Sequence, residues 1–344
     1  MKKYIKYSFN KLKKYIHTYE ASPLFEVKDK RLKTTRLSLN IKNKKKNFYY
    51  IIRRTPGAGF FSNFIYVLNH LKIADRLNYK PVVDMENFPT IYNESVYING
   101  TKNAWNYYFQ EKSNYNLKKI YKKENYFLTN NVFNKSFSHN IDSDDFRKIF
   151  KKYFNIKKEY LDLAEKFYNK NFLNEKVLAI HLRGTSYKTS ANHPFPTTIK
   201  QSINLINNLK EKYNFTKLFL CTDDLAYFDK FHKKFQNEII FIKNSYRSYK
   251  DDAFKIYPRK KHRYKMGKDI LIEALLMSKC NGFVYTNSNV SAFVKFLDKK
   301  NIIKYFAINN GFNSSNEYIA NWLWYYKNLV PSFLGGFVDK VDVK

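Results

Sequence analysis

Hydrophobic and polar residues follow two different periods along most of the chain. Short apolar runs, each bounded by Gly, Asn, Asp or Lys, alternate with longer segments in which apolar residues recur every three or four positions. The short runs predict buried strands, and the longer segments predict amphipathic helices. Strands that are apolar on both faces are typical of a parallel sheet covered by helices. The pattern therefore predicts an α/β fold.

The predicted elements alternate in order along the chain. The strands are residues 47–53, 80–85, 176–183, 217–224, 238–244, 282–287 and 302–309. The helices are residues 64–78, 158–171, 197–213, 225–235, 268–280 and 288–298. Residues 86–150 are aromatic, polar and irregular, and their pattern does not order any elements.

A chain of 344 residues is long enough for two domains of ordinary size. We expect four parts, with a boundary between two α/β domains near residue 170. These parts are a basic N-terminal segment (1–46), an N-terminal α/β domain (47–170), a C-terminal Rossmann-like domain (171–310) and a C-terminal helical tail (311–344).

The net charge of +34 is the strongest compositional bias and would suit a nucleic-acid-binding protein. However, the chain is rich in Lys, Asn, Ile, Tyr and Phe together, a mixture that AT-rich codons produce without selection for a polyanion. Only 10 of the 63 basic residues are Arg, the side chain preferred for bidentate phosphate contacts. We therefore expect no nucleic-acid partner, and retain nucleic-acid binding only as an alternative that steep salt dependence would reveal.

Residues 1–46 hold 15 Lys or Arg residues and three acidic residues. Within them Ile5, Phe9, Leu12 and Ile16 fall at helical spacing. One interpretation is an amphipathic helix in peripheral contact with an anionic membrane. The other is a solvated helix that packs on its own protein.

The remaining composition points to the cytoplasm. No stretch approaches the roughly 18 apolar residues that would span a membrane, and the N-terminus is a poor secretory signal. Cys221 and Cys280 cannot form a disulfide framework, and no Cys or His cluster has zinc spacing. We expect a cytoplasmic protein, peripheral at the inner face of the inner membrane if residues 1–46 bind lipid.

Ligands of open parallel sheets bind beyond the carboxyl ends of the strands, so the residues that follow each strand are the most informative. His181 and Arg183 end one predicted strand, and Gly184 and Thr185 follow them. Arg183 would bind a phosphate, or pair with a carboxylate such as Asp223. His181 would contact a nucleotide, or be a hydrogen-bonded core residue.

Asp223 and Asp224 end the next predicted strand. They would hold a ribose or sugar, or cap the helix that follows. We expect no metal here, because no third or fourth ligand lies near in sequence.

Glu273 lies on an otherwise apolar helix, and a buried charge needs a partner. A nucleobase edge, a Lys or an Arg would serve. Ser288, Asn289 and Val290 open the helix after the next strand, where free backbone N–H groups favour phosphate; the alternative is helix capping without a ligand.

A glycine turn containing Gly57 and Gly59 precedes the helix at 64–78. Two Phe residues and Ser62 follow, where a dinucleotide fingerprint would place its third glycine. We therefore expect no NAD(P) site, although backbone could approach a sugar or phosphate closely at this turn.

Five segments, taken in their order along the chain, resemble the fucosyltransferase superfamily. They are the glycine turn with its helix, HLRGT (181–185), TDD (222–224), ILIEALLMSKC (270–280) and TNSNVS (286–291). That superfamily includes nodulation-type and N-glycan-core α-1,6-fucosyltransferases, protein O-fucosyltransferases and, more distantly, α-1,2-fucosyltransferases. Many bacterial surface-polysaccharide glycosyltransferases look similar. The match covers residues 176–298 well and 50–85 weakly.

The resemblance implies a GT-B-like, inverting enzyme of two Rossmann-like domains facing a cleft. It would need no cofactor and no essential metal, and the second domain would hold most of the donor, a GDP-sugar. The family roles would assign Arg183 to the donor β-phosphate, His181 to the guanosine, Glu273 to guanine recognition, and Ser288 with Asn289 to phosphate. The first domain, residues 86–150 and residues 245–266 would shape the acceptor side.

Two departures from the family pattern concern catalysis. Gly184 and Ser186 replace the second Arg and the Asp of the motif H-x-R-R-T-D, and the glutamate proposed as base in the core-type enzymes has no match. Residues 188–194 contain no acid, so the candidate bases are His193 or, elsewhere, Asp84, Asp251 and Asp252.

The function expected from these features is transfer of a sugar, fucose in the first place, from a GDP-sugar. The acceptor would be a glycan or lipid-linked glycan of bacterial surface polysaccharide or lipopolysaccharide synthesis. The alternative on the same scaffold is a different nucleotide-sugar donor.

Overall fold

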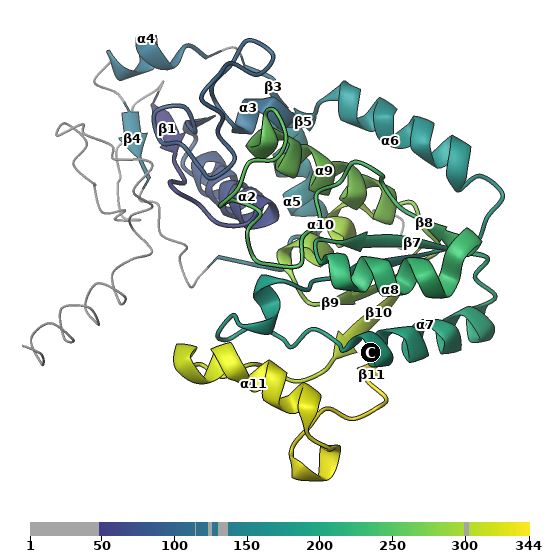
Figure 1. Ribbon diagram of the computed structural model, residues 1–344. Coiled ribbons are helices and arrows are strands. Elements are labelled where there is room, and N and C mark those ends of the chain that lie inside the picture. The colour runs from purple at the N-terminus through teal and green to yellow at the C-terminus, as the bar shows by residue number, and fades with distance from the viewer. Residues whose placement is uncertain (1–47, 114, 123–125, 130–136, 299–302) are drawn as a thin grey trace, which may run out of the picture. The chain divides into compact units, whose positions relative to one another are not determined.

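The computed structural model describes residues 48–113, 115–122, 126–129, 137–298 and 303–344. Residues 1–46, where the amphipathic helix is predicted, lie outside this range. The described chain divides into two compact units. The first runs up to Phe137 and includes Ile149–Asn155, and the second comprises Ser138–Lys148 and Ile156–Lys344. Both are built from strands and helices (Figure 1).

The first unit contains a parallel three-stranded sheet in the order β2-β1-β4. Strands β1 (Tyr49–Ile52) and β2 (Lys80–Val83) are joined by helix α2 (Phe60–Arg76), which confirms the predicted β-loop-α-β unit. Ile51, Val82 and Leu128 lie in the hydrophobic cluster of this sheet. The other elements are β4 (Tyr126–Leu128), α3 (Trp105–Tyr108), β3 (Phe109–Glu111), α4 (Leu117–Tyr121), α5 (Asp144–Tyr153, whose start belongs to the second unit) and β5 (Phe154–Ile156).

The second unit is built on a six-stranded sheet in the order β11-β10-β9-β6-β7-β8. All neighbouring strands are parallel except β10 and β11. The strands are β6 (Val177–Leu182), β7 (Lys217–Thr222), β8 (Ile239–Ile240), β9 (Gly282–Thr286), β10 (Lys304–Asn309) and β11 (Asp342–Val343).

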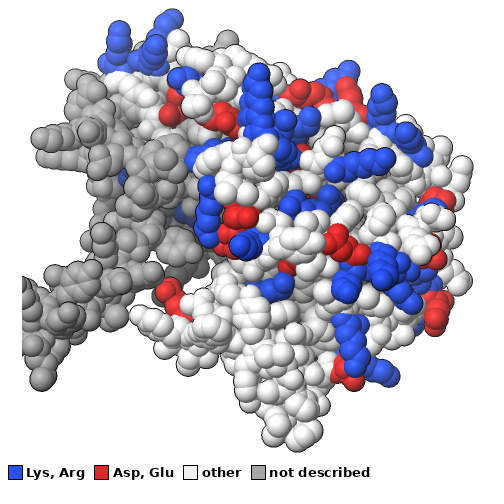
Figure 2. Space-filling model, in the orientation of Figure 1, with Lys and Arg blue, Asp and Glu red and all other residues white. Residues whose placement is uncertain are grey.

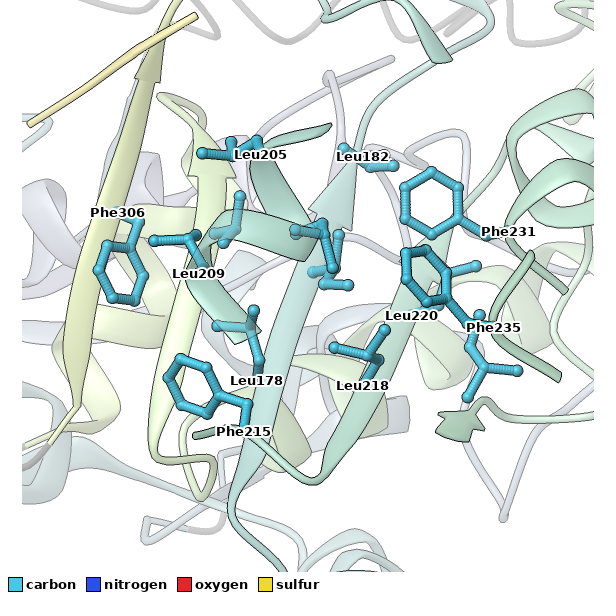
Figure 3. Close-up of a cluster of buried hydrophobic side chains, with 14 of the residues drawn as sticks. Leu178, Leu182, Leu205, Leu209, Phe215, Leu218, Leu220, Phe231, Phe235 and Phe306 are labelled. Carbon is cyan, nitrogen blue, oxygen red and sulfur yellow. The ribbon is translucent and has the colours of Figure 1, made fainter. Parts of the chain in front are cut away.

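Helices α7 (Ile199–Tyr213) and α8 (Leu225–Phe235) pack on one face of this sheet. Their side chains form a core with Leu178, Leu182 and Leu220 and other strand residues (Figure 3). Because side chains alternate along a strand, His181 points to the opposite face. That face carries Phe219, which packs against Phe167 of α6 (Lys158–Asn171). The helices α9 (His262–Met277) and α10 (Asn289–Leu297) pack against each other, and α6 packs against α9.

The predicted strands at 176–183, 217–224 and 282–287 are confirmed, but two other elements differ from the prediction. Strand β8 ends at Ile240, since the following Phe241 packs edge-on against Phe228 as part of a loop. Helix α9 begins at His262 instead of residue 268. Its first turns contain no apolar stripe, so the hydrophobic period does not reveal them.

Within the described residues, no helix combines the length and apolar character that a membrane crossing requires. Cys221 and Cys280 are free thiols and both are buried. Burial raises the pKa of each thiol above its ordinary value, so both remain protonated packing residues.

Candidate functional site

The informative residues of the second unit gather at the carboxyl edge of its sheet. Strand β6 lies between β7 and β9, and all three are parallel. Residues that follow these strands therefore meet at one edge, where ligands of such sheets bind. Arg183 follows β6, Asp223 follows β7 and Ser288 follows β9.

Arg183 lies against an aromatic ring and makes a loose contact with a carboxylate. Its guanidinium is 4.6 Å from the centroid of the Tyr187 ring. Its Nε is 3.9 Å from Asp223 Oδ2, which is too long for a hydrogen bond. The Arg183 side chain is 29% exposed, so the cation remains open to solvent. The predicted pairing with Asp223 is present, but in a form that an anion could replace.

Asp223 and Asp224 have different partners. Asp223 accepts hydrogen bonds from the Gly184 backbone N–H and from Thr185 Oγ1, each at 3.2 Å. It therefore fastens the loop after β6. Asp224 is buried and caps helix α8, accepting from two backbone N–H groups of its first turn, and it also accepts from Lys188 Nζ at 2.6 Å. For Asp224, the helix-capping interpretation holds.

His181 is a buried, neutral side chain. Burial, with a further contribution from the Arg183 charge, lowers the pKa of His181 to about 3. Its Nδ1 has no hydrogen-bond partner in the described part of the chain. A buried polar atom without a partner is unusual and is consistent with a group that a ligand completes.

Glu273 of α9 is buried and has a raised pKa. It is 7% exposed, and burial raises its pKa to about 7, although the Ser245 hydrogen bond and the Arg247 charge act in the opposite direction. Ser245 Oγ donates to Glu273 Oε1 at 2.8 Å. No described residue donates to Oε2. The hydrogen-bond partner of this carboxylate is thus a serine hydroxyl, which was not among the predicted partners (a nucleobase, a Lys or an Arg), and the charge of Arg247 acts on it as well.

Arg247 supports this carboxylate. From the sequence, Arg247, Arg259 and Arg263 of segment 245–266 are expected to bind an anionic acceptor or the donor phosphates, or to lie in a solvated loop, and a contact with Glu273 is not among these alternatives. Its guanidinium lies 4.5 Å from the Phe228 ring centroid and 5.5 Å from that of Phe241. It also donates to the backbone oxygens of Ser245 and Ile242, each at 3.2 Å. Arg247 therefore holds the loop that places Ser245 on Glu273. The scarcity of Arg in this chain marks Arg247 as a residue of interest, but it does not reveal these partners.

Ser288 caps α10 through a reciprocal pair of hydrogen bonds with Ser291. The capping interpretation therefore holds for the Ser288 side chain. Asn289 and Val290 are the first residues of α10. The backbone N–H groups of a helix's first turn have no partner within the helix and favour an anion, so the phosphate interpretation remains a prediction for this turn.

His193 lies on the loop that follows Arg183. Its Nδ1 is 2.7 Å from the Ala191 carbonyl oxygen. A carbonyl only accepts, so Nδ1 carries the proton and Nε2 of the neutral ring has a free lone pair. The His193 ring packs edge-on against Tyr187, with centroids 5.0 Å apart. Tyr187 thus contacts both Arg183 and His193.

The carboxylates considered as alternative bases have other partners. Asp84 is fully buried in the first unit and accepts hydrogen bonds from two backbone N–H groups, from Asn87 Nδ2 and from Tyr121 OH. All its acceptor positions are used, so we assign it a structural role. Asp252 accepts from Tyr246 OH, and Asp251 is exposed and lies 3.8 Å from Lys255 Nζ.

The glycine turn of the first unit has a structural explanation. Gly57 has φ +77°, and a Cβ there would lie 2.8 Å from Asn63 Oδ1. Asn63 in turn bonds the backbone N–H and C=O of Ala58. Gly57 is therefore required by the turn itself, whereas Gly59 has open space beside it. Nothing in the described residues brings three His, Cys, Asp or Glu side chains together as a metal site.

Comparison with known proteins gives a match at the level of three-dimensional structure. No protein-family model and no curated protein sequence matches the chain. The crystal structure of NodZ α-1,6-fucosyltransferase soaked with GDP-fucose matches with a TM-score of 0.51 and 14% identity, over 77% of this chain and 95% of that chain. The chain has the NodZ fold. The expected GT-B-like α/β fold is therefore confirmed.

Two other solved structures match with lower TM-scores. NodZ from Bradyrhizobium matches with a TM-score of 0.49 and 13% identity, over 77% of this chain and 96% of that one. A mutant of Arabidopsis thaliana FUT1 in complex with GDP matches with a TM-score of 0.43 and 10% identity, over 81% and 74%. NodZ is a fucosyltransferase, from the superfamily that the sequence motifs resemble. At this level of sequence identity, the similarity between these proteins and the chain shows a shared fold and nothing beyond it.

Proposed function

We propose that the chain is a glycosyltransferase that transfers fucose from GDP-fucose to a glycan. The observation that supports this best is the arrangement around Glu273. One carboxylate oxygen is held by Ser245, the other has no described donor, and the neutral His181 lies on the same side of the sheet. The NodZ fold, solved with a GDP-sugar, makes a guanine nucleotide the natural candidate for this position.

A buried carboxylate suits guanine because of the hydrogen-bonding groups on that base. Guanine presents an N1–H and an exocyclic amino group side by side, and both donate. Adenine presents an acceptor at N1, which would face the carboxylate and leave it without a donor. An unpaired buried charge is costly, so the ionised Glu273 would discriminate strongly between these bases.

Arg183 would act on the leaving group. As the bond to the anomeric carbon breaks, negative charge grows on the β-phosphate of GDP. A guanidinium placed there stabilises the transition state more than the ground state, which is what raises turnover. The first turn of α10, beginning at Asn289, would bind the same pyrophosphate through its backbone N–H groups.

His193 would act as the general base. Its Nε2 lone pair would accept the proton of an acceptor hydroxyl as that hydroxyl attacks the anomeric carbon from the face opposite GDP, with inversion. Tyr187, which contacts the His193 ring and the Arg183 guanidinium, would fix the distance between the base and the phosphate-binding cation. Neither role requires a metal. We further propose that the acceptor is a glycan, free or lipid-linked, of bacterial surface-polysaccharide or lipopolysaccharide synthesis, as the resemblance implies.

Nucleotide binding tests the proposal directly. Thermal unfolding would be measured with GDP, UDP, ADP and CMP, and hydrolysis would be measured for the matching nucleotide sugars. We expect GDP alone to raise the unfolding temperature and GDP-fucose to be hydrolysed fastest. Stabilisation by UDP, ADP or CMP would favour the alternative donor. Steep salt-dependent binding to DNA, with no response to any nucleotide, would replace the enzyme hypothesis by nucleic-acid binding.

A further inference from the structure

Helix α11 (Glu317–Leu329) has two apolar faces, and only one of them is covered. The inner face buries Ala320 and Trp324, and Trp324 Nε1 donates to the Pro196 backbone oxygen at 3.2 Å. The opposite face presents Tyr318, Trp322, Tyr325 and Leu329, which follow helical spacing and are all exposed. A helix that is apolar on both sides is normally buried on both sides. The outer face of α11 therefore needs a partner that the described chain does not supply.

The exposed apolar surface continues past the end of the helix. The 3-10 turn η3 (Ser332–Leu334) exposes Phe333 and Leu334, and Phe333 is 83% exposed. We define the aromatic ridge as the exposed residues of this region: Tyr318, Ile319, Trp322, Tyr325, Tyr326, Leu329, Phe333 and Leu334. Figure 2 shows almost no charged side chains over this part of the second unit, although the chain as a whole carries +34. Contiguous exposed apolar patches of this kind mark interaction sites.

The composition and size of the ridge argue against a protein partner. A standard protein interface uses about 20–30 residues on each side, several times more than the ridge provides. A second copy of this chain would also bring another charge of +34 toward the first, and such repulsion opposes association.

A lipid surface fits both observations. Trp and Tyr are the residues enriched at membrane–water interfaces, where an apolar ring enters the acyl region and a polar atom stays hydrated. An anionic bilayer attracts a strongly basic protein. We propose that the aromatic ridge inserts shallowly into the interface of an anionic lipid bilayer. This inference does not depend on the proposed enzyme activity.

Trp322 provides a local probe for the test. The chain has three Trp residues. Trp105 and Trp324 are buried, and Trp322 is 74% exposed. With the full chain and vesicles of phosphatidylcholine plus phosphatidylglycerol, we expect the Trp emission to shift to the blue and to be quenched by lipids brominated on their acyl chains. The Trp322→Phe variant should lose both responses, while it still binds the vesicles.

A second variant tests the contribution of the ridge to binding. The triple change Trp322→Ser, Leu329→Ser and Phe333→Ser should weaken vesicle binding about tenfold or more, since it removes most of the inserted apolar area. The matched control changes Leu161 and Leu173 to Ser, because both are also exposed but lie on and beside α6. The control should bind as the unaltered chain does. Circular dichroism would confirm that both variants are folded.

Two results would overturn the proposal. If vesicles bind without any blue shift or quenching of Trp322, the contact lies elsewhere, for example in residues 1–46. If light scattering shows a dimer that the triple variant converts to a monomer, the ridge is an interface between two copies of the chain.

Discussion

The Asp224 side chain occupies the space in which a side chain at position 184 would begin. A Cβ on Gly184 would lie 2.2 Å from both Cβ and Oδ2 of Asp224. Asp224 is fixed in place because it caps α8 and holds Lys188. This contact explains why position 184 is glycine.

The first prediction follows from that contact. Gly184→Ala should lower the free energy of unfolding by about 2–3 kcal/mol, since a methyl group forced into a packed site displaces buried groups. Urea unfolding measures the change. Gly59→Ala is the matched control, because a Cβ there meets no atom within 4 Å, and it should change stability little. Equal stability of the two variants would show that Asp224 moves aside at little cost.

The second prediction concerns the pH dependence of donor binding. In the proposed function guanine binds the ionised form of Glu273, and burial raises the pKa of this carboxyl to about 7. Affinity should therefore be full above that pH and fall as the pH drops below it, by about tenfold between pH 8 and pH 6. Titration calorimetry with GDP-fucose is the suitable measurement, because its esterified phosphates do not titrate in this range. Glu273→Gln should bind more weakly and lose the pH dependence.

The third prediction separates binding from stability at the same residue. A carboxyl whose pKa is raised on folding binds a proton more tightly in the folded state, so its ionisation destabilises the protein as the pH rises from about 4.5 to 7. Without nucleotide, Glu273→Gln should therefore unfold at a higher temperature than the unaltered chain at pH 8, and the difference should shrink at pH 5. A variant less stable at both pH values would indicate that the Ser245 contact outweighs the cost of the buried charge.

The fourth prediction concerns Arg183. Arg183→Ala should reduce kcat about a hundredfold or more, with a smaller change in KM, since the guanidinium acts mainly on charge that develops in the transition state. Tyr187→Phe keeps the ring beside the guanidinium and should stay near full activity, whereas Tyr187→Ala should lose part of kcat. Unchanged turnover in a folded Arg183→Ala protein would remove this residue from the mechanism.

The fifth prediction concerns the general base. Removal of a general base costs about a hundredfold to ten-thousandfold in rate. His193→Ala should reduce the rate of sugar transfer to the acceptor by a factor of this size. The decrease in kcat/KM toward acidic pH should also disappear in this variant. His193→Asn, whose amide nitrogen can take the place of Nδ1 and still donate to Ala191, controls for the loop structure. If both variants keep the unaltered pH profile, another group takes the proton.

Strands β6, β7 and β9 of the second unit, and the residues that follow them, were predictable from the sequence. Their apolar runs are long enough to give a clear period, and parallel strands place Arg183, Asp223 and Ser288 at one edge by topology alone. Pairing between short, distant segments was not predictable. Strands β3 and β5 are each three residues long and lie far apart in the chain, so no local pattern links them.

Side-chain partners within the site were also beyond the sequence. Tyr187 is one of 30 tyrosines, and nothing in its neighbours marks it as the residue between Arg183 and His193. Arg247 reaches Ser245 and Phe228 through a loop whose path no period describes. Such contacts depend on how loops fold over a finished sheet, and that is decided by tertiary packing.

The loop that carries His193 is held from the far end of the chain. Asn313 N–H donates to the His193 backbone oxygen at 2.8 Å, and Asn192 N–H donates to the Ser314 oxygen at 3.0 Å. The residues that follow β10 therefore hold the loop of the candidate base, and they also lead into α11. Removing or exchanging the residues after β10 would loosen the base even with strands β6 to β10 intact, so any chimera of this protein has to exchange the two segments together.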